Sequence, residues 1–147
     1  MKGMNITRMK GNEAGSVLRV GKVTEYDAAT QRARVNFPEL RIISHWLPVI
    51  AMNTLKTHDT HYLDAGEHVV CLMNGTGTES GYVLGAIYDD KNKPQECGQD
   101  IRSVKFDDDT TMTYDRGSHK LFINVQGDIE IVAKGHMQLT AERIDLN

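Results

Sequence analysis

Hydrophobic residues in the last third of the chain recur every eight positions. Three series share this interval: Leu121, Ile129 and Met137; Ile123, Ile131 and Leu139; and Val125, Ala133 and Ala141. Within each unit the apolar positions are also two apart, so the pattern predicts short β-strands joined by turns at a fixed interval. About three such units cannot bury their own apolar face, so further repeats or identical chains must cover it. The pattern therefore favours a homo-oligomer.

Residues 16–88 carry a different strand pattern. Alternating apolar positions, separated by turn residues, predict strands at 16–26, 31–37, 42–50, 67–73 and 81–88. Five short antiparallel strands with a long loop at 51–65 fit a small barrel of the oligonucleotide/oligosaccharide-binding (OB) type, and a two-sheet sandwich fits nearly as well. The residues expected in the core of this domain are Val35, Trp46, Val69, Val83 and Leu84.

The rest of the chain divides around these two patterns. Residues 1–15 have no clear period and are expected to form an arm that is mobile or bound to a partner. Residues 89–100 are charged and contain Pro94 and Gly98, which is typical of a linker. In residues 101–147 we expect strands at 104–106 and 111–115, turns at 107–109 and 116–118, and then the eight-residue repeats. The predicted fold class is all-β, with an OB-like domain at 16–88 and a repeat domain at 101–147.

Charge and composition limit the possible partners. The net charge is −3 with histidine neutral, which argues against nucleic acid, because neutralising phosphates needs concentrated Lys and Arg. No window approaches the roughly 18 apolar residues of a membrane span, and no apolar signal-peptide core precedes residue 16. Synthesis in the cytoplasm is expected. Cys71 and Cys97 have no metal-ligand spacing, so both are expected to be free thiols.

Two clusters have side chains suited to chemistry, but neither has a recognisable spacing. His58, Asp59 and His61 could hold one edge of a metal site, yet no further ligand completes it, so solvated loop histidines are favoured by about four to one. Asp107–Asp109 offer carboxylates for a cation or for glycoside hydrolysis, yet adjacent residues are not arranged as a pair. We therefore expect a protein that is not an enzyme, with no catalytic residue, no metal site and no cofactor.

The aromatic residues of the first domain leave an alternative function open. Trp46 and the tyrosines of residues 16–88 could provide stacking surfaces, as in OB-type modules that bind carbohydrate or single-stranded nucleic acid. The sequence lacks the basic groove that this mechanism needs for nucleic acid. Packing against Leu47 or Val49 is the favoured role for Trp46.

Several short motifs, taken in order, resemble one known family. They are Gly21-Lys-Val-Thr-Glu25, Arg34-Val35, Trp46-Leu-Pro48, Gly66-Glu-His-Val69, Gly81-Tyr-Val-Leu-Gly85 and the final repeat ending in Ile144-Asp-Leu-Asn147. Over residues 16–147 the chain resembles the phage baseplate assembly protein V family, the central spike of contractile tails and related injection machines. The order of the motifs, together with the terminal repeats, gives this resemblance its weight.

The resemblance implies a homotrimer with an OB-fold collar and an intertwined C-terminal β-helix, or β-prism. Such a spike pierces a bacterial outer membrane, joins a tail hub to a small tip-capping protein, and belongs to the baseplate of a virion or phage-like particle assembled in the host cytoplasm. The trimer core would contain Leu121, Ile123, Val125, Ile129, Ile131, Met137, Leu139, Ile144 and Leu146.

One feature of the family has no counterpart in this sequence. Longer relatives carry an apex His-x-His pair that holds an axial iron. Here the chain stops at Asn147, and His119 and His136 form no such pair. The resemblance therefore gives no reason to expect a metal apex. Either a separate small protein caps the tip, or the sequence is a shortened form.

Overall fold

The computed structural model describes residues 16–75, 80–94 and 98–145 of the 147-residue chain. The chain divides into two compact units, Met1–Lys93 and Pro94–Asn147, and the boundary falls within the segment expected as a linker. The described residues contain two antiparallel sheets and no helix, so the all-β prediction is confirmed. No helix long and apolar enough to cross a membrane is found in this part of the chain. The arm at 1–15 and Leu146 lie outside the described residues.

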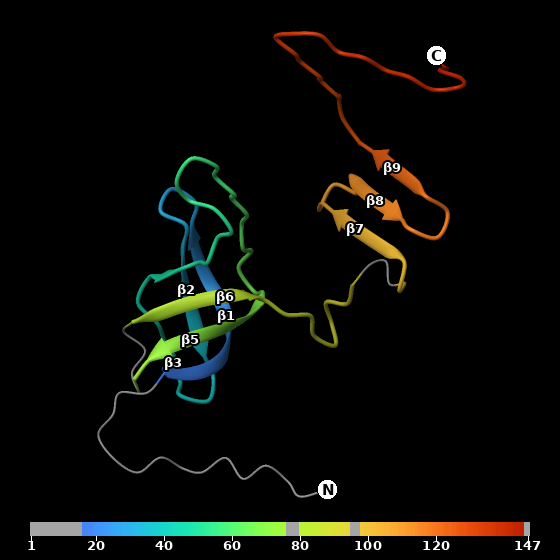
Figure 1. Ribbon diagram of the computed structural model, residues 1–147. Coiled ribbons are helices and arrows are strands. Elements are labelled where there is room, and N and C mark those ends of the chain that lie inside the picture. The colour runs from blue at the N-terminus through green and yellow to red at the C-terminus, as the bar shows by residue number, and fades with distance from the viewer. Residues whose placement is uncertain (1–15, 76–79, 95–97, 146–147) are drawn as a thin grey trace, which may run out of the picture. The chain divides into compact units, whose positions relative to one another are not determined.

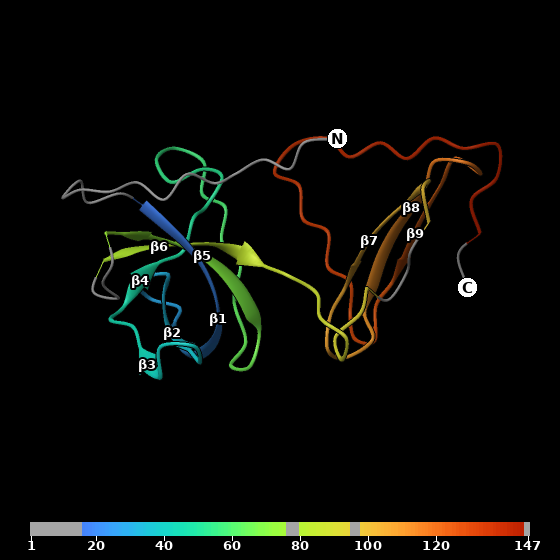
Figure 2. The same cartoon turned by 90° about the horizontal axis from the view of Figure 1, so that it is seen from below.

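The first unit is built on one six-stranded sheet (Figures 1 and 2). Its strands are β1 (Ser16–Asp27), β2 (Arg32–Phe37), β3 (Ile42–Ile43), β4 (Leu47–Pro48), β5 (His68–Asn74) and β6 (Gly81–Ala86). The order is β3-β2-β1-β5-β6, and β4 also pairs with β2. Val49, just after β4, forms a parallel bridge with Val83 of β6, and the Ile50 amide donates to the Val83 carbonyl at 3.0 Å. This bridge links β6 to the strand segment on the other side of β2.

Strand β1 is shared between two neighbours. Its first half, Ser16–Lys22, pairs with β5, and its second half pairs with β2. Gly21 lies at the changeover, where a Cβ atom would come within 2.8 Å of the Asn36 carbonyl oxygen and would also meet the Val35 side chain. A residue without a side chain is therefore needed for β1 to pass this close to β2.

The core of the first unit comes from alternate positions of its strands. Residues that point inward from β2 and β5 are fully buried, while their neighbours are half-buried or exposed. Val35, Val69 and Val83 lie in this core, as expected, and Leu63 from the loop at 51–65 also joins it. Cys71 is a free thiol here, and burial raises its pKa to about 11. Cys97 lies outside the described residues.

Two residues expected in this core are not there. Trp46 is 40% exposed and Leu84 is 41% exposed. Consecutive residues of an extended chain point to opposite faces, and in both cases the adjacent residue, Leu47 or Val83, takes the inward position. The prediction that Leu84 lies in the core beside Val83 was therefore wrong. The prediction that Trp46 lies in the core was also wrong.

The third predicted strand, 42–50, is interrupted. Strand β2 pairs Asn36 with Ile43 and then Ala33 with Leu47, so the three residues 44–46 lie opposite only two residues of β2. This extra residue is a β-bulge. Ser44, which is buried, sits within it: its amide donates to the Val35 carbonyl at 2.8 Å, and its hydroxyl accepts the Val35 amide at 2.9 Å.

The second unit contains a three-stranded sheet in the order β7-β8-β9 (Figure 1). Its strands are β7 (Ile101–Lys105), β8 (Thr111–Asp115) and β9 (Lys120–Asn124). The turns lie where the sequence predicted them. The first is closed by the Phe106 amide donating to the Thr110 carbonyl at 2.9 Å, and the second by Asp115, which accepts the Gly117 amide at 2.8 Å and the Ser118 hydroxyl at 2.6 Å.

Candidate subunit interface

Beyond β9 the chain continues as an extended segment, residues 125–145 (Figures 1 and 2). Bends interrupt it at Gln126–Gly127, at Lys134–Gly135 and at Glu142. These bends fall eight residues apart, which is the interval of the hydrophobic repeat. The backbone therefore follows the same period as the side-chain pattern.

The backbone of this extended segment has almost no hydrogen-bond partners among the described residues. Among the described residues, no backbone–backbone hydrogen bond involves residues 125–145. Near the start of the segment, the Gln126 amide donates to the Thr110 hydroxyl at 3.2 Å. Backbone N–H and C=O groups that leave water must be paired, and a stack of extended chains pairs them between neighbours. The segment thus presents two unpaired edges.

The apolar side chains of the repeats are also uncovered in the single chain. Ile131 is 71% exposed and Leu139 67%, and Val125 alone among the described members of the predicted trimer core is half-buried. The exposed members are Leu121, Ile123, Ile129, Ile131, Met137, Leu139 and Ile144. Repeated exposed apolar residues of this kind mark a contact surface.

The three-stranded sheet adds a further apolar surface. The register places Val104 opposite Met112 and Met112 opposite Ile123, while Tyr114 lies opposite Leu121. Because side chains alternate between faces, these five residues share one face of the sheet. The opposite face carries a contact between the Ser103 and Thr113 hydroxyls at 3.2 Å, and Lys120 lies over the Phe122 ring at 5.5 Å. The sequence analysis placed Leu121 and Ile123 in the predicted trimer core. It did not identify the residues of β7 and β8 that share a face of the sheet with them.

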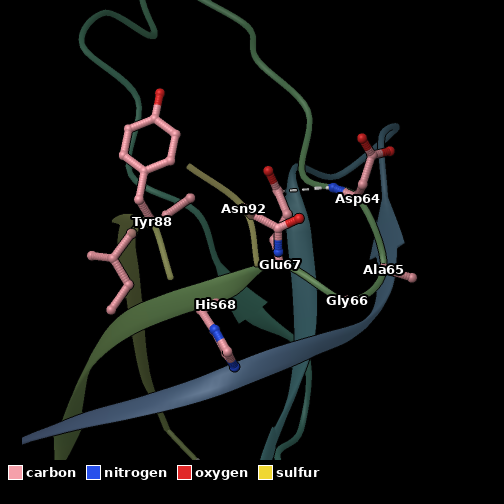
Figure 3. A pocket seen from close by; sticks show the side chains of 9 residues that line it. Asp64, Ala65, Gly66, Glu67, His68, Tyr88 and Asn92 are labelled. Carbon is pink, nitrogen blue, oxygen red and sulfur yellow. Dashed lines mark hydrogen bonds between the residues drawn. The ribbon is translucent and has the colours of Figure 1, made fainter. Parts of the chain in front are cut away.

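The first unit has a pocket of about 610 Å³ (Figure 3). It is lined by Asp64–His68, Ala86–Tyr88 and Asn92. At its side, the His68 Nδ1 lies 2.6 Å from an Asp89 carboxylate oxygen. The pKa of Asp89 is lowered, first because the Asn92 amide donates to its carboxylate and last because His68 is near. This acidic pocket was not predicted, because its residues come from a loop, from β5, from the end of β6 and from the chain that follows it.

The first unit also has an apolar outer face that the sequence analysis did not identify. Leu18 lies opposite Leu72, and Leu72 lies opposite Tyr82, across the neighbouring strands β1, β5 and β6. Leu18, Val20, Tyr82 and Leu84 are exposed. The described residues of this unit leave these side chains exposed.

The histidine cluster at residues 58–61 stays on an exposed loop. The His61 carbonyl accepts the Tyr26 hydroxyl at 2.7 Å, a contact that uses the backbone of His61 and not its imidazole. Within the described ranges, no group of three or more His, Cys, Asp or Glu side chains is placed to hold a metal ion.

The carboxylates of Asp107–Asp109 lie in the turn between β7 and β8. Asp108 accepts the Thr110 amide at 2.8 Å, and Asp109 lies 2.7 Å from the Lys105 ammonium. That hydrogen bond from Lys105 lowers the pKa of Asp109. These contacts account for two of the three aspartates as parts of the turn.

Comparison with models of known protein families finds no match to this chain. A search of curated proteins also finds no match. The assignment of function therefore depends on the repeat, on the unpaired extended segment and on the exposed apolar faces.

Proposed function

We propose that this protein is the structural spike of a contractile tail or contractile injection machine. In this proposal, three identical chains wind residues 121–146 around a common axis to form a rigid shaft. The observation that carries it is the extended segment 125–145, which bends every eight residues. Among the described residues, no backbone–backbone hydrogen bond involves this segment, and most of its apolar side chains are exposed.

A closed ring of three chains would pair the backbone of this segment and cover its apolar side chains. Each chain then has a neighbour on either side, so both of its unpaired edges find hydrogen-bond partners and no edge is left open. The alternating apolar residues point to the axis and fill it, while Asp128, Glu130 and Gln138 point to water. The sequence repeat requires a partner with the same eight-residue spacing, which an identical chain provides.

The first unit also supports this proposal, because we infer that it forms a small OB-type barrel. Strand β1 pairs with β2 and β5, β2 pairs with β3 and β4, and the parallel Val49–Val83 bridge links the end of β4 to β6. In this proposal these pairings form a closed path in which β3 and β4 count as one bulged strand. A five-stranded closed path with one long loop, at 51–65, is the architecture of an OB fold. In a spike this barrel forms the collar that joins the shaft to the tail hub.

The proposed activity is mechanical. Sheath contraction drives the spike against a bacterial outer membrane, and a small capping protein covers the open end of the shaft. Intertwined chains unfold only with concerted loss of many contacts, so the shaft keeps its shape under load. The protein then acts in the tail baseplate of a virion or phage-like particle.

Two adjacent substitutions test the proposal. Ile131→Asp places three carboxylates on the axis, where each would be buried without a partner, and we expect loss of the trimer. Val132→Asp is the matched control, because the neighbouring side chain points to the other face and is 78% exposed in the single chain. Sedimentation equilibrium of both variants gives the result. Trimeric Ile131→Asp protein with unchanged thermal stability would contradict the proposal.

The pocket beside His68 favours a second candidate, a binding module for carbohydrate. Tyr88, which is 71% exposed, lines the pocket, and an aromatic ring beside carboxylates is a usual surface for sugars. The acidic lining does not suit nucleic acid. Calorimetric titration with cell-wall oligosaccharides, using Tyr88→Ala as the control, tests this candidate, and absence of any heat of binding by the unaltered protein rejects it.

A further inference from the structure

We propose that the pocket beside His68 binds the guanidinium group of an arginine side chain on a partner protein. The carboxylates of this pocket come from the loop before β5, and its aromatic ring comes from Tyr88, after β6. The proposal concerns the pocket alone and does not rest on the trimeric shaft. It gives the pocket an occupant different from the carbohydrate considered above.

Two carboxylates of the pocket have acceptor oxygens for a ligand. Glu67 Oε2 accepts the Asp64 amide at 2.9 Å, which fixes the direction of the Glu67 side chain. Among the described residues, no hydrogen bond or ion pair engages the other oxygen of Glu67 or the carboxylate of Asp64. Both groups can therefore accept N–H donors from a cation.

The turn that carries these carboxylates is held against β1. The Gly66 amide donates to the Val23 carbonyl at 2.8 Å, and the Val23 amide donates to the Glu67 carbonyl at 2.9 Å. Gly66 has a φ of 105°, a conformation that favours glycine. A site whose groups are already in place has a smaller entropic cost of ordering when it binds a ligand.

The ring of Tyr88 supplies a second kind of contact. Tyr88 is 71% exposed, and in the view of Figure 3 its ring stands on the other side of Glu67 from Asp64. A planar guanidinium can stack on an aromatic ring while its edge donates to carboxylates. An ammonium group is a compact charge and cannot stack in this way. The combination of ring and carboxylates therefore favours arginine over lysine.

The charge of the lining favours an organic cation. The described residues that line the pocket include two carboxylates and no lysine or arginine, and the nearby Lys91 and Lys93 do not line it. The His68 imidazole lies 2.6 Å from Asp89, so a proton on the imidazole is offset by that carboxylate. Within the described ranges these groups are not placed to hold a metal ion.

The size of the pocket suits a side chain that belongs to a peptide. Its volume of about 610 Å³ lies within the range of roughly 300–1,000 Å³ that is usual for ligand sites. Ala65, Gly66 and Ala86 have small side chains and leave this space open. The pocket thus has room for an arginine side chain together with the backbone that carries it.

Titration with a small arginine probe tests the proposal. N-acetyl-arginine amide carries the guanidinium, and N-acetyl-citrulline amide is its uncharged counterpart of nearly the same shape. Amide chemical shifts of His68 and Tyr88 in the isotope-labelled full-length protein report binding. We expect saturable shifts with the arginine probe, weakened by added salt, and none with the citrulline probe. Equal shifts with both probes, or no shifts with either, would overturn the proposal.

Variants of the pocket locate the binding. Glu67→Gln keeps an oxygen for the Asp64 amide but removes the charge, so we expect the arginine probe to bind about fivefold more weakly. Tyr88→Leu removes the ring and should also weaken binding. Glu39→Gln is the matched control, because it removes an exposed carboxylate that does not line this pocket. If either pocket variant binds the probe as tightly as the control does, the proposal fails.

Two further probes separate the possible sources of the cation. N-acetyl-lysine amide and glucosamine both carry an ammonium group, and we expect both to bind more weakly than the arginine probe. Glucosamine binding as tightly as the arginine probe would overturn the assignment to a protein partner and favour a sugar. Equal binding of the lysine probe would overturn the assignment to a guanidinium. The mass of the protein in solution tests the shaft separately, so a negative result here leaves that proposal standing.

Discussion

The hydroxyl of Ser44 accepts the backbone amide of Val35 at 2.9 Å, and the Ser44 amide donates back to the Val35 carbonyl at 2.8 Å. One residue thus satisfies both main-chain groups of Val35, one of them with its side chain. This pairing makes the bulge between β3 and β4. The bulge lets the chain keep its hydrogen bonds while one extra residue is accommodated beside β2.

Replacement of this serine should destabilise the first unit. Ser44→Ala leaves the Val35 amide buried without an acceptor, which costs about 1–3 kcal/mol. We expect a lower urea midpoint in the transition followed by Trp46 fluorescence, the chain having one tryptophan. His45→Ala, at the next and exposed position, is the control and should change the midpoint little. An unchanged midpoint for Ser44→Ala would show that this pairing does not stabilise the bulge.

Gly21→Ala should destabilise the same unit by overpacking. The added methyl group would press on the Asn36 carbonyl and the Val35 side chain, so β1 and β2 must separate. Overpacking of this kind costs about 1–3 kcal/mol. Urea unfolding of this variant should show the loss, while Lys22→Ala, whose side chain is exposed, should unfold like the parent protein. Equal midpoints for the two variants would mean that the strands adjust without cost.

The stability of the turn after β6 should depend on pH, because the Asp89 carboxylate holds this turn. Its carboxylate accepts the amides of Lys91 at 2.9 Å and of Asn92 at 2.6 Å, and these bonds lower its pKa below the ordinary value of 3.8. Because the pKa is lower in the folded state, the ionised carboxylate stabilises the fold at pH values above the ordinary pKa. This stabilisation is lost as the pH falls through the folded-state pKa.

An NMR titration tests this behaviour. The amide proton shifts of Lys91 and Asn92 should stay constant from neutral pH and change with a midpoint below 3.8. The variant Asp89→Asn should not show this acid transition. A midpoint at or above 3.8 in the parent protein would contradict the geometry of the turn.

Hydrogen exchange should reveal the partners of the extended segment. Within the chain, residues 128–145 have no backbone hydrogen bonds in the described structure, so an isolated chain leaves their amides open to solvent. In the proposed trimer the same amides are bonded between chains, and we expect slow exchange that becomes faster when the protein is diluted below the concentration at which the trimer dissociates. Fast exchange at every concentration would mean that no partner chain pairs with this segment.

Much of the fold follows from local patterns in the sequence. The alternation in 31–37 and 67–73 gives both the strands and the inward positions of Val35 and Val69, because side-chain direction in a regular strand has period two. The acidic turn at 107–109 and the Gly117 turn also lie where their residue types predict. These features depend on neighbours along the chain.

Other features depend on pairing between distant segments. The bulge at Ser44 changes which residues of 42–50 face inward, so the hydrophobicity of Trp46 gives no information about its direction. Leu63 joins the core from a loop that reads as polar. Met112 shares a face with Ile123 only through the register of two strands. The pocket beside His68 likewise combines a loop, a strand and the start of the linker.

The mass of the full-length protein in solution tests the central claim most directly. Sedimentation equilibrium at micromolar concentration should give three times the mass of one chain. The exposed repeats, and the backbone of residues 128–145, which has no hydrogen bonds in the described structure, require two neighbours in this account. A single species with the mass of one chain would contradict the account.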